Sequence, residues 1–314
     1  MAWSPSRNDS RSGAMPDRAA GRHCSLADTM ANIENVSDTA RWVAVYRAME
    51  TARPDAIFRD PYAERLAGEH GVRIVEGMKR GRAMAWAMIV RTTVMDEMIL
   101  ERIRQGTDTV LNLAAGLDAR AWRMSLPPDL HWIDVDLPAM SEYKANIMRD
   151  ERPVCHYEAI AADLTDAAVR DALFAQVGRS ARSLLVITEG LLIYLEQGDV
   201  ESLARAIHAL PSARWWITDI ASPMLLEWMR KSWGKSVESG NAPFRFGPAD
   251  SAAFFKTLGW HEAEYHSQIE EARRLKREMR MMWLWRIVGR FMSAKRRAAA
   301  ARMSGILLLQ RIDN

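Results

Sequence analysis

The chain has 314 residues, and 48% of them are hydrophobic, which is enough to bury the core of one large α/β domain. Its 43 basic and 40 acidic residues leave a formal net charge of only +3, which excludes the strong positive field of a dedicated nucleic-acid binder. Cys24 and Cys155 lie far apart, and no Cys/His cluster has the spacing of a zinc site, so we expect a cytoplasmic protein without a metal. No apolar run is long enough to span a membrane, so no transmembrane segment is expected.

The first part of the chain is predicted to be disordered and then helical. Residues 1–36 are rich in Ser, Arg, Asp and Gly, which is typical of a disordered extension. Apolar residues at helical spacing over 37–106 predict a helical cap. Within it, a second helix is expected to follow the turn at Asp60-Pro61 and to end at Gly68, and a third, long amphipathic helix is expected to end at Gly106.

From residue 110 the pattern changes to short apolar runs that alternate with segments of helix length. Such alternation is typical of βαβ units in a parallel sheet. We expect one domain over 37–314, with a doubly wound α/β core over 107–267, a basic amphipathic helical insertion over 268–304 and a final strand within 305–314. About seven strands are predicted in a mostly parallel sheet, at 110–113, 131–137, 155–160, 184–190, 214–220, 259–267 and 305–312.

A turn of small residues, Ala114-Ala115-Gly116, directly follows the first predicted strand. Doubly wound sheets bind ligands beyond the carboxyl ends of their strands, and a turn without bulky side chains lets the backbone approach a ligand. The turn alone equally fits a plain strand-to-helix connection. About twenty residues later, Asp136 ends the second strand, where nucleotide-binding folds place an acid for ribose hydroxyls, and Asp134 is the competing candidate.

Two further acids follow predicted strands. Asp163 can accept the amino group of adenine, or it can cap the helix expected to start near Thr165, and the two roles weigh about equally. Glu189 closes an apolar strand just before Gly190, where packing does not explain a carboxylate. We therefore expect Glu189 to face a cleft.

Four stretches of the sequence carry a resemblance to a known family. They are VSDTARWVAVYRA with IFRDPYAERLAG, VRTTVMDEMI, VLNLAAGLDARAWRM with WIDVDLP, and ITEGLLIYLE. In this order they resemble the S-adenosylmethionine-dependent methyltransferases of the leucine carboxyl methyltransferase family, in particular its bacterial O-methyltransferase branch. The similarity runs from about residue 36 to the C-terminus. It implies a Rossmann-like class I methyltransferase fold and the cofactor S-adenosyl-L-methionine.

The resemblance implies that Arg91 pairs with the methionine carboxylate of the cofactor and that Ala114, Ala115 and Gly116 line the loop beneath it. From the residues alone, Arg91 would be a solvated helix arginine. The family normally has glycine at the position of Ala114 and a hydroxyl residue at that of Ala119. An added methyl can weaken cofactor binding where the backbone comes close, although alanine is tolerated if its φ is negative.

The same resemblance gives the ribose to Asp136, the adenine to Asp163 and Leu164, and the amino end of the methionine part to Glu189. The cofactor carries a carboxylate, an ammonium, a diol and an exocyclic amine, and the candidate side chains offer a complementary group to each. The implied function is an S-adenosylmethionine-dependent O-methyltransferase.

The acceptor is expected to be a small carboxylic acid or hydroxyl metabolite, in preference to a protein carboxyl terminus. A carboxylate is already ionised at neutral pH and needs no base, whereas an alcohol or phenol benefits from one. Tyr194, five residues after Glu189, is the candidate catalytic residue at the methyl-transfer site, with a core tyrosine as its alternative. None of the seven histidines can be assigned as a general base.

Residues 273–302 join many Arg and Lys residues to Met, Trp and Phe, the composition of an interfacial amphipathic helix. This segment can pack on the core, cover an apolar acceptor or make a weak contact with a membrane surface, and packing or a lid is favoured. Two other functions stay open. One is a non-catalytic or weakly active S-adenosylmethionine-binding or peripheral membrane protein; the other is an NAD(P)-dependent oxidoreductase, whose three-glycine fingerprint is absent here.

Overall fold

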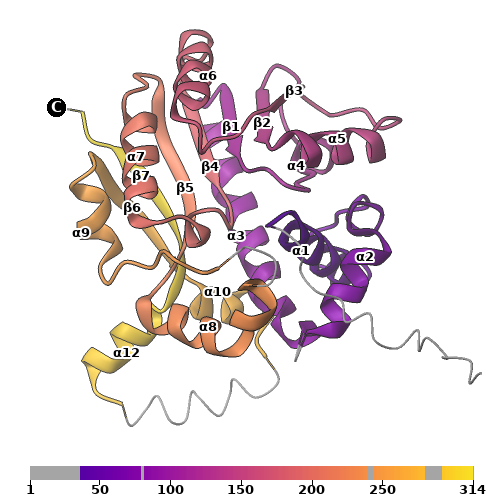
Figure 1. Cartoon of the computed structure of the whole chain (residues 1–314), viewed down its shortest axis with the longest axis vertical. Helices are drawn as coiled ribbons and strands as arrows, with labels where there is room; N and C mark the ends of the chain where they lie inside the picture. Colours follow the sequence, from indigo (N-terminus) through magenta and orange to yellow (C-terminus); the bar gives the residue numbers. More distant parts are fainter. Residues whose placement is uncertain (1–35, 79–80, 239–242, 280–291, 314) are drawn as a thin grey trace, which may run out of the picture. The chain divides into compact units, whose positions relative to one another are not determined.

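A seven-stranded sheet forms the centre of the computed structural model, which describes residues 36–78, 81–238, 243–279 and 292–313 (Figure 1). The strands are β1 (Thr109–Leu113), β2 (His131–Asp136), β3 (His156–Ala161), β4 (Leu184–Thr188), β5 (Ala213–Ala221), β6 (Trp260–Ser267) and β7 (Ser304–Arg311). Their order is β3-β2-β1-β4-β5-β7-β6; β1 to β5 are parallel, and β7 is antiparallel to both neighbours. This confirms the Rossmann-like sheet, whose switch point lies between β1 and β4.

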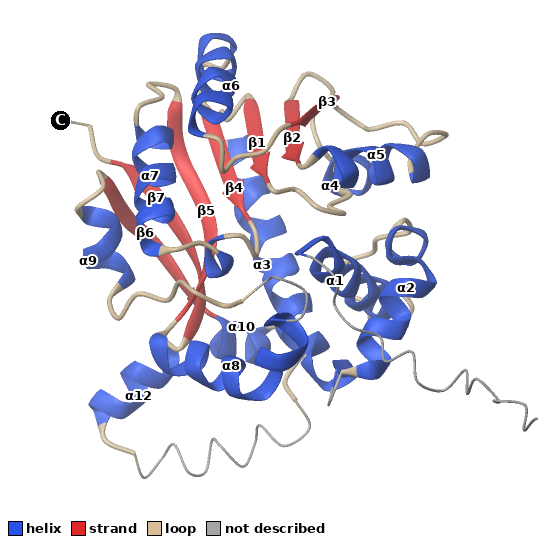
Figure 2. Cartoon of the chain, in the orientation of Figure 1, coloured by secondary structure: helices blue, strands red, loops and turns tan. Residues whose placement is uncertain are grey.

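Helices connect the strands and precede the sheet. They are α1 (Val36–Thr51), α2 (Ala63–Gly77), α3 (Ala85–Arg104), α4 (Arg120–Arg123), α5 (Pro138–Ile147), α6 (Ala167–Ser180), α7 (Gln197–His208), α8 (Pro223–Glu238), α9 (Ser251–Lys256), α10 (Gln268–Arg274) and α12 (Ala294–Ala301), with the short 3₁₀ turns η1 (Gly81–Met84) and η2 (Leu192–Tyr194). Figure 2 shows α7 on one face of the sheet and α3 on the other.

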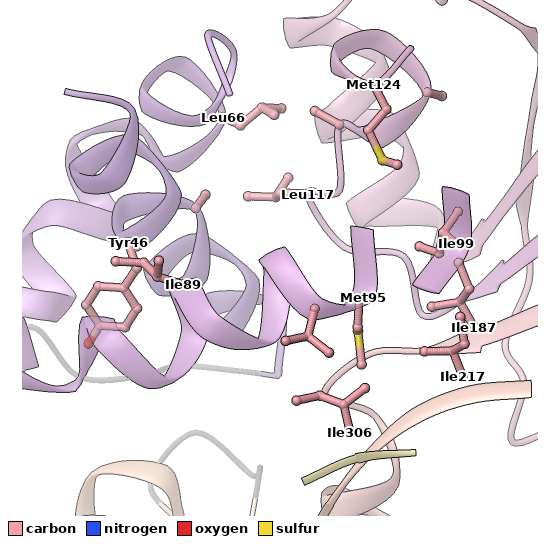
Figure 3. Packing of buried hydrophobic residues seen from close by; sticks show 14 of the residues in the cluster. Tyr46, Leu66, Ile89, Met95, Ile99, Leu117, Met124, Ile187, Ile217 and Ile306 are labelled. Carbon is pink, nitrogen blue, oxygen red and sulfur yellow. The ribbon is translucent and has the colours of Figure 1, made fainter. Parts of the chain in front are cut away.

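The sheet is covered on both faces, which explains why β1 and β4 are buried at every residue. Successive side chains of β1 point to opposite faces, so Val110 belongs to the core on the α3 side and Leu111 to the core under α6 and α7. In the first of these cores, Met95 of α3 lies against Ile187 and Ile217 of neighbouring strands (Figure 3). The two cores hold the carboxyl ends of the strands in fixed positions.

The second helix ends at Gly68, as expected. Gly68 leaves helical geometry, with φ 60° and ψ 177°, so α2 consists of two helical segments on either side of this kink, and the second one reaches Gly77. A Cβ on Gly71 would lie 3.1 Å from the carbonyl oxygen of Arg41 and 3.2 Å from Val45 Cγ2, so this second segment packs closely on α1. Tertiary packing supports a helical segment that was not among the helices expected from the sequence.

The predicted basic insertion over 268–304 is described only at its ends, by α10 and α12. Residues 280–291, which hold most of its Trp and Met residues, lie outside the described part of the chain. The extension predicted over 1–36 also lies outside it, apart from Val36, where α1 begins. Within the residues that the structure does describe, no helix has the length and apolar character needed to cross a bilayer.

Candidate active site

A cavity of about 2030 Å³ lies at the carboxyl ends of the parallel strands, where they meet α1, α3 and α8. Doubly wound folds bind their ligands at this edge of the sheet. Every site residue proposed from the sequence lines this cavity: Arg91, Ala114, Ala115, Gly116, Asp136, Asp163, Leu164, Glu189 and Tyr194. The sequence signals thus converge on one place, although they come from five separate segments.

The turn after β1 contains two residues in the left-handed region. Ala114 has φ 52° and Gly116 has φ 53°. Glycine adopts this region freely, whereas the left-handed conformation costs an L-residue roughly 1–2 kcal/mol of conformational free energy. Alanine is tolerated at this position only if its φ is negative, so Ala114 is a strained residue. At Gly116 a Cβ would lie 3.0 Å from the Cβ of Ala40 in α1, which adds a close approach to the positive φ.

Asp136 and Asp134, the competing acids of β2, have different surroundings. Asp136 lines the cavity and accepts the backbone amides of Gly116 at 2.6 Å and Leu137 at 2.7 Å. Burial raises the pKa of Asp136, and the two amides offset this only in part. Asp134 is buried and accepts a hydrogen bond from Lys144 Nζ at 2.6 Å, away from the main cavity. Of the two acids, only Asp136 is placed to meet a ligand there.

Asp163 does not cap the helix that follows it. Helix α6 starts at Ala167, and its cap is Asp166, which accepts two backbone amides of the first turn. Asp163 instead accepts the amide and the hydroxyl of Thr165 through Oδ1, at 2.9 and 2.7 Å, and these bonds lower the pKa of its carboxyl. Its side chain is exposed at the cavity, beside Leu164.

Arg91 is buried and paired with two acids. Its Nε donates to Glu189 at 3.0 Å, and its Nη1 donates to Asp219 at 3.1 Å. Burial opposes the charge of this guanidinium, but Asp219 and Glu189 outweigh it and raise the pKa of Arg91. Asp219 also accepts the amide of Gly190 at 2.6 Å. The sequence-based picture of a solvated arginine is therefore wrong.

Arg120 is almost fully buried and connects the ion pair of Arg91 and Glu189 to the ion pair of Arg123 and Asp96. It donates to Glu189 and Asp118 at 2.7 Å each and to Asp96 of α3 at 2.6 Å. Arg123 binds the same Asp96. Burial raises the pKa of the Glu189 carboxyl, yet Arg120 and Arg91 outweigh it, so the net shift is downward. Glu189 is thus an ionised carboxylate held between two arginines.

Five members of this network are absent from the residues proposed from the sequence: Asp96, Asp118, Arg120, Arg123 and Asp219. Asp219 could have been found from the sequence, because it is a carboxylate near the end of the apolar run RWWITDI. Glu189 was found by the same signal at the end of its own strand. Asp118 and Arg120 follow the small-residue turn directly, where polar groups near a ligand are common. No local pattern shows that Arg120 pairs with Glu189, which lies 69 residues away.

Tyr194 is half-buried at the end of η2 and lines the cavity next to Phe244, with the ring centroids 5.8 Å apart. Burial raises the pKa of Tyr194 to about 12, although a hydrogen bond shared with Thr39 and the charge of Arg91 act in the opposite direction. At neutral pH its phenol is therefore protonated. It can donate a hydrogen bond but cannot serve as a base. Among the described residues, no histidine lines the cavity either.

Comparison with known proteins identifies the family. The family model for leucine carboxyl methyltransferases matches residues 40–208. A protein of Streptomyces coelicolor, named provisionally as an S-adenosyl-L-methionine-dependent methyltransferase, is 39% identical over 179 residues, which cover 54% of this chain and 63% of that protein. A Streptomyces avermitilis protein with the same kind of name is 32% identical over 250 residues, covering 74% of this chain and 86% of its own.

Solved structures show the same fold. A DUF574 family protein from Streptomyces avermitilis has a TM-score of 0.58 at 14% identity, over 87% of this chain and 97% of its own. A protein from Thermobifida fusca, provisionally named a methyltransferase, has a TM-score of 0.57 at 12% identity, over 91% and 97%. With the match of the family model, these findings bear out the resemblance seen in the motifs. The chain belongs to the leucine carboxyl methyltransferase family, a group of S-adenosylmethionine-dependent methyltransferases.

Proposed function

We propose that the protein transfers a methyl group from S-adenosylmethionine to a carboxylate or hydroxyl oxygen of a small metabolite. The charge balance of the site carries the proposal. Within the arginine network, four carboxylates, those of Asp96, Asp118, Glu189 and Asp219, face the three guanidiniums of Arg91, Arg120 and Arg123, which leaves one net negative charge. Asp136 and Asp163, which also line the cavity, add further acids to the site. The cofactor, with its sulfonium, ammonium and carboxylate groups, carries one net positive charge. The two are complementary in sign.

The acids after β2 and β3 fit the nucleoside part of the cofactor. Each Asp136 oxygen accepts one amide, so each keeps a lone pair for a ribose hydroxyl. Asp163 uses only Oδ1 on Thr165, and its Oδ2 is left to accept the adenine amino group beside Leu164. These two acids supply acceptors without any movement of the backbone.

The network around Arg91 fits the methionine part. Arg91 donates Nε and Nη1 to acids, which leaves Nη2 for a carboxylate because no described residue accepts a hydrogen bond from it. Glu189 already accepts hydrogen bonds from two guanidiniums, and Asp219 accepts them from one guanidinium and one backbone amide. Each carboxylate keeps further lone pairs, which can accept hydrogen bonds from an ammonium group. We assign the carboxylate to Arg91 and the ammonium to Glu189.

When bound, S-adenosylmethionine supplies an electrophilic methyl group for in-line displacement. The residues of the chain position the acceptor oxygen and exclude water. The cavity offers no histidine base among the described residues, and Glu189 is a weak base because two arginines stabilise its ionised form. Tyr194 can orient an acceptor oxygen by donating a hydrogen bond to it. These features favour an acceptor that arrives ionised, a carboxylate, over a hydroxyl that needs deprotonation.

Membership of a methyltransferase family speaks against the NAD(P)-dependent oxidoreductase, and a transfer assay separates an enzyme from a non-catalytic binding protein. The protein is incubated with methyl-labelled S-adenosylmethionine and a panel of carboxylic acids, alcohols, phenols, amines and thiols. Alkali-labile label marks methyl esters, and alkali-stable label in alcohols or phenols marks ethers. Label on oxygen supports the proposal. Label only on nitrogen or sulfur, or none despite cofactor binding, contradicts it.

A further inference from the structure

The cavity has room for more than the cofactor. Sites for drug-sized ligands measure roughly 300–1,000 Å³. The volume of about 2030 Å³ found here is about twice the upper value, and the groups assigned to the cofactor occupy only the edge formed by the strands. A second space therefore extends from this edge toward the start of α3 and toward α8.

The walls of this second space are mainly apolar and rich in methionine, and the exposed charged side chains of Lys231, Arg245, Glu270, Arg273 and Arg297 also line the cavity. Met84, at the end of η1, and Ala87 and Met88 of α3 contribute one wall at helical spacing. Helix α8 contributes Met224 and Trp228 in the same way. Nine of the 19 methionines in the chain line the cavity. Methionine side chains are flexible and polarisable, so such walls adapt to irregular apolar ligands.

Exposed apolar side chains of the described residues are concentrated at the cavity, mainly on the α8 side. Seven large ones are exposed, and four of these line the cavity: Leu137, Met224, Trp228 and Met279. Met224 and Trp228 expose 61% and 48% of their surface. Apolar surface that gathers at a cavity in this way marks a ligand-binding surface.

A few buried polar atoms belong to residues that line the apolar walls. The hydroxyls of Thr92 and Ser267 and the indole nitrogen of Trp86 are buried, and they have no hydrogen-bond partner among the described residues. All three residues line the cavity. Buried polar groups are normally paired, and a site with a few polar groups among apolar walls is typical of a pocket that orients a ligand.

We infer that the methyl acceptor is a bulky, largely apolar molecule with few polar groups besides the one methylated, and that the Met- and Trp-lined space at α3 and α8 selects it. This inference rests on the proposed function and narrows its substrate class. Small hydrophilic acids fit poorly, because they would leave this apolar surface in contact with water. Long-chain or aromatic acceptors cover it.

Calorimetry tests the inference without turnover. The protein, saturated with the demethylated cofactor S-adenosylhomocysteine, is titrated with straight-chain acids from butanoic to decanoic and with the matching alcohols. Each methylene buried should raise the affinity about fourfold. The double variant Met224→Ala/Trp228→Ala should bind decanoic acid roughly tenfold more weakly. The control Val72→Ala/Val169→Ala alters side chains exposed to 39% and 44% that do not line the cavity, and it should bind like wild type.

The outcomes separate the inference from the proposed function. An affinity that does not rise with chain length, or a cavity variant that binds like the control, overturns the inference. Methylation of butanoic acid as efficient as that of decanoic acid also overturns it and leaves the proposed function intact. A rise of affinity with chain length, lost in the cavity variant, supports the inference; if no oxygen of any acceptor is then methylated, only the proposed function fails.

Discussion

Ala114 occupies a backbone conformation that suits glycine, at φ 52° in the turn under the proposed cofactor site. Ala114→Gly removes roughly 1–2 kcal/mol of strain, while the freer unfolded chain costs roughly 0.4–1 kcal/mol. We expect the variant to be more stable by roughly 0.5–1 kcal/mol in chemical denaturation. Ala115→Gly, at a residue without positive φ, is the control and should gain nothing. A less stable Ala114→Gly protein would show that the strain is absent.

Glu189 is the acid that holds Arg91 and Arg120 together, and its removal leaves two buried guanidiniums each short of a partner. Glu189→Gln should lower the free energy of unfolding at neutral pH by about 3 kcal/mol. Its lowered pKa means that the stabilisation is fully present above the ordinary glutamate pKa of about 4.3 and is lost as the pH falls through the lower folded-state value. The difference between wild type and variant should therefore shrink in acid.

The measurement is denaturant unfolding across a pH series. Glu69→Gln is the matched control, because the Glu69 side chain is 95% exposed on α2. The control should follow the wild type at every pH. If Glu189→Gln also follows it, the ion pairs with Arg91 and Arg120 contribute nothing to stability.

At the scale of single residues, the sequence predicts where site residues lie better than it predicts their ion-pair partners. Asp136 and Glu189 can be found because a carboxylate that ends an apolar strand is unusual, and Asp219 carries the same signal. Arg91 could not be recognised as buried, because its two partners lie 98 and 128 residues further along the chain. The conformation of Ala114 was equally hidden, since φ depends on the turn and not on the residue alone.

At the scale of elements, α1 closes over the turn that follows β1. Arg47 on α1 donates to the carbonyl of Leu117 at 2.5 Å and to Asp60 at 2.8 Å, and both Arg47 and Asp60 are buried. The Cβ of Ala40 stands against Gly116. The helix is therefore a wall of the proposed cofactor site, and Arg47 supplies a hydrogen bond that joins it to the turn.

Arg47→Gln should loosen this wall, because hydrogen bonds to a charged group contribute about 1.5–3 kcal/mol. We expect faster hydrogen exchange in α1 and roughly tenfold weaker binding of S-adenosylmethionine. Arg73→Gln, at a side chain 59% exposed on α2, is the control and should change neither quantity. If hydrogen exchange in α1 is unchanged in the Arg47 variant, Arg47 does not hold α1 against the turn.

Strands were more predictable than the number of helical segments. All seven expected runs correspond to strands. The runs of β1 and β4, buried at every residue, are mostly apolar, whereas β3 and β6 at the sheet edges are partly exposed and carry more polar residues. Gly106, with φ 98°, follows the end of α3, and Gly68, with φ 60°, ends the first segment of α2, both as expected. The second helical segment of α2 was not expected, because it depends on packing against α1.

At the scale of the whole molecule, the topology brings the site together. The order β3-β2-β1-β4-β5 places the ends of β2, β1, β4 and β5 side by side, so Asp136, the turn after β1, Glu189 and Asp219 meet although the chain visits them far apart. The fold class could be predicted from the alternation of strands and helices. The Met- and Trp-lined space at α3 and α8 could not be predicted, because no local sequence pattern specifies how these two helices pack.

The central claim is that S-adenosylmethionine binds at the carboxyl ends of these strands through Asp136. Isothermal titration of the full chain with S-adenosylmethionine, and separately with NADH, tests it most directly. Asp136→Ala is the test variant, and Asp129→Ala, which removes an exposed acid outside the cavity, is the control. We predict binding of S-adenosylmethionine to wild type and control, at least tenfold weaker binding to Asp136→Ala, and none of NADH. Equal binding to wild type and to a folded Asp136→Ala protein, or preferential binding of NADH, would contradict the account.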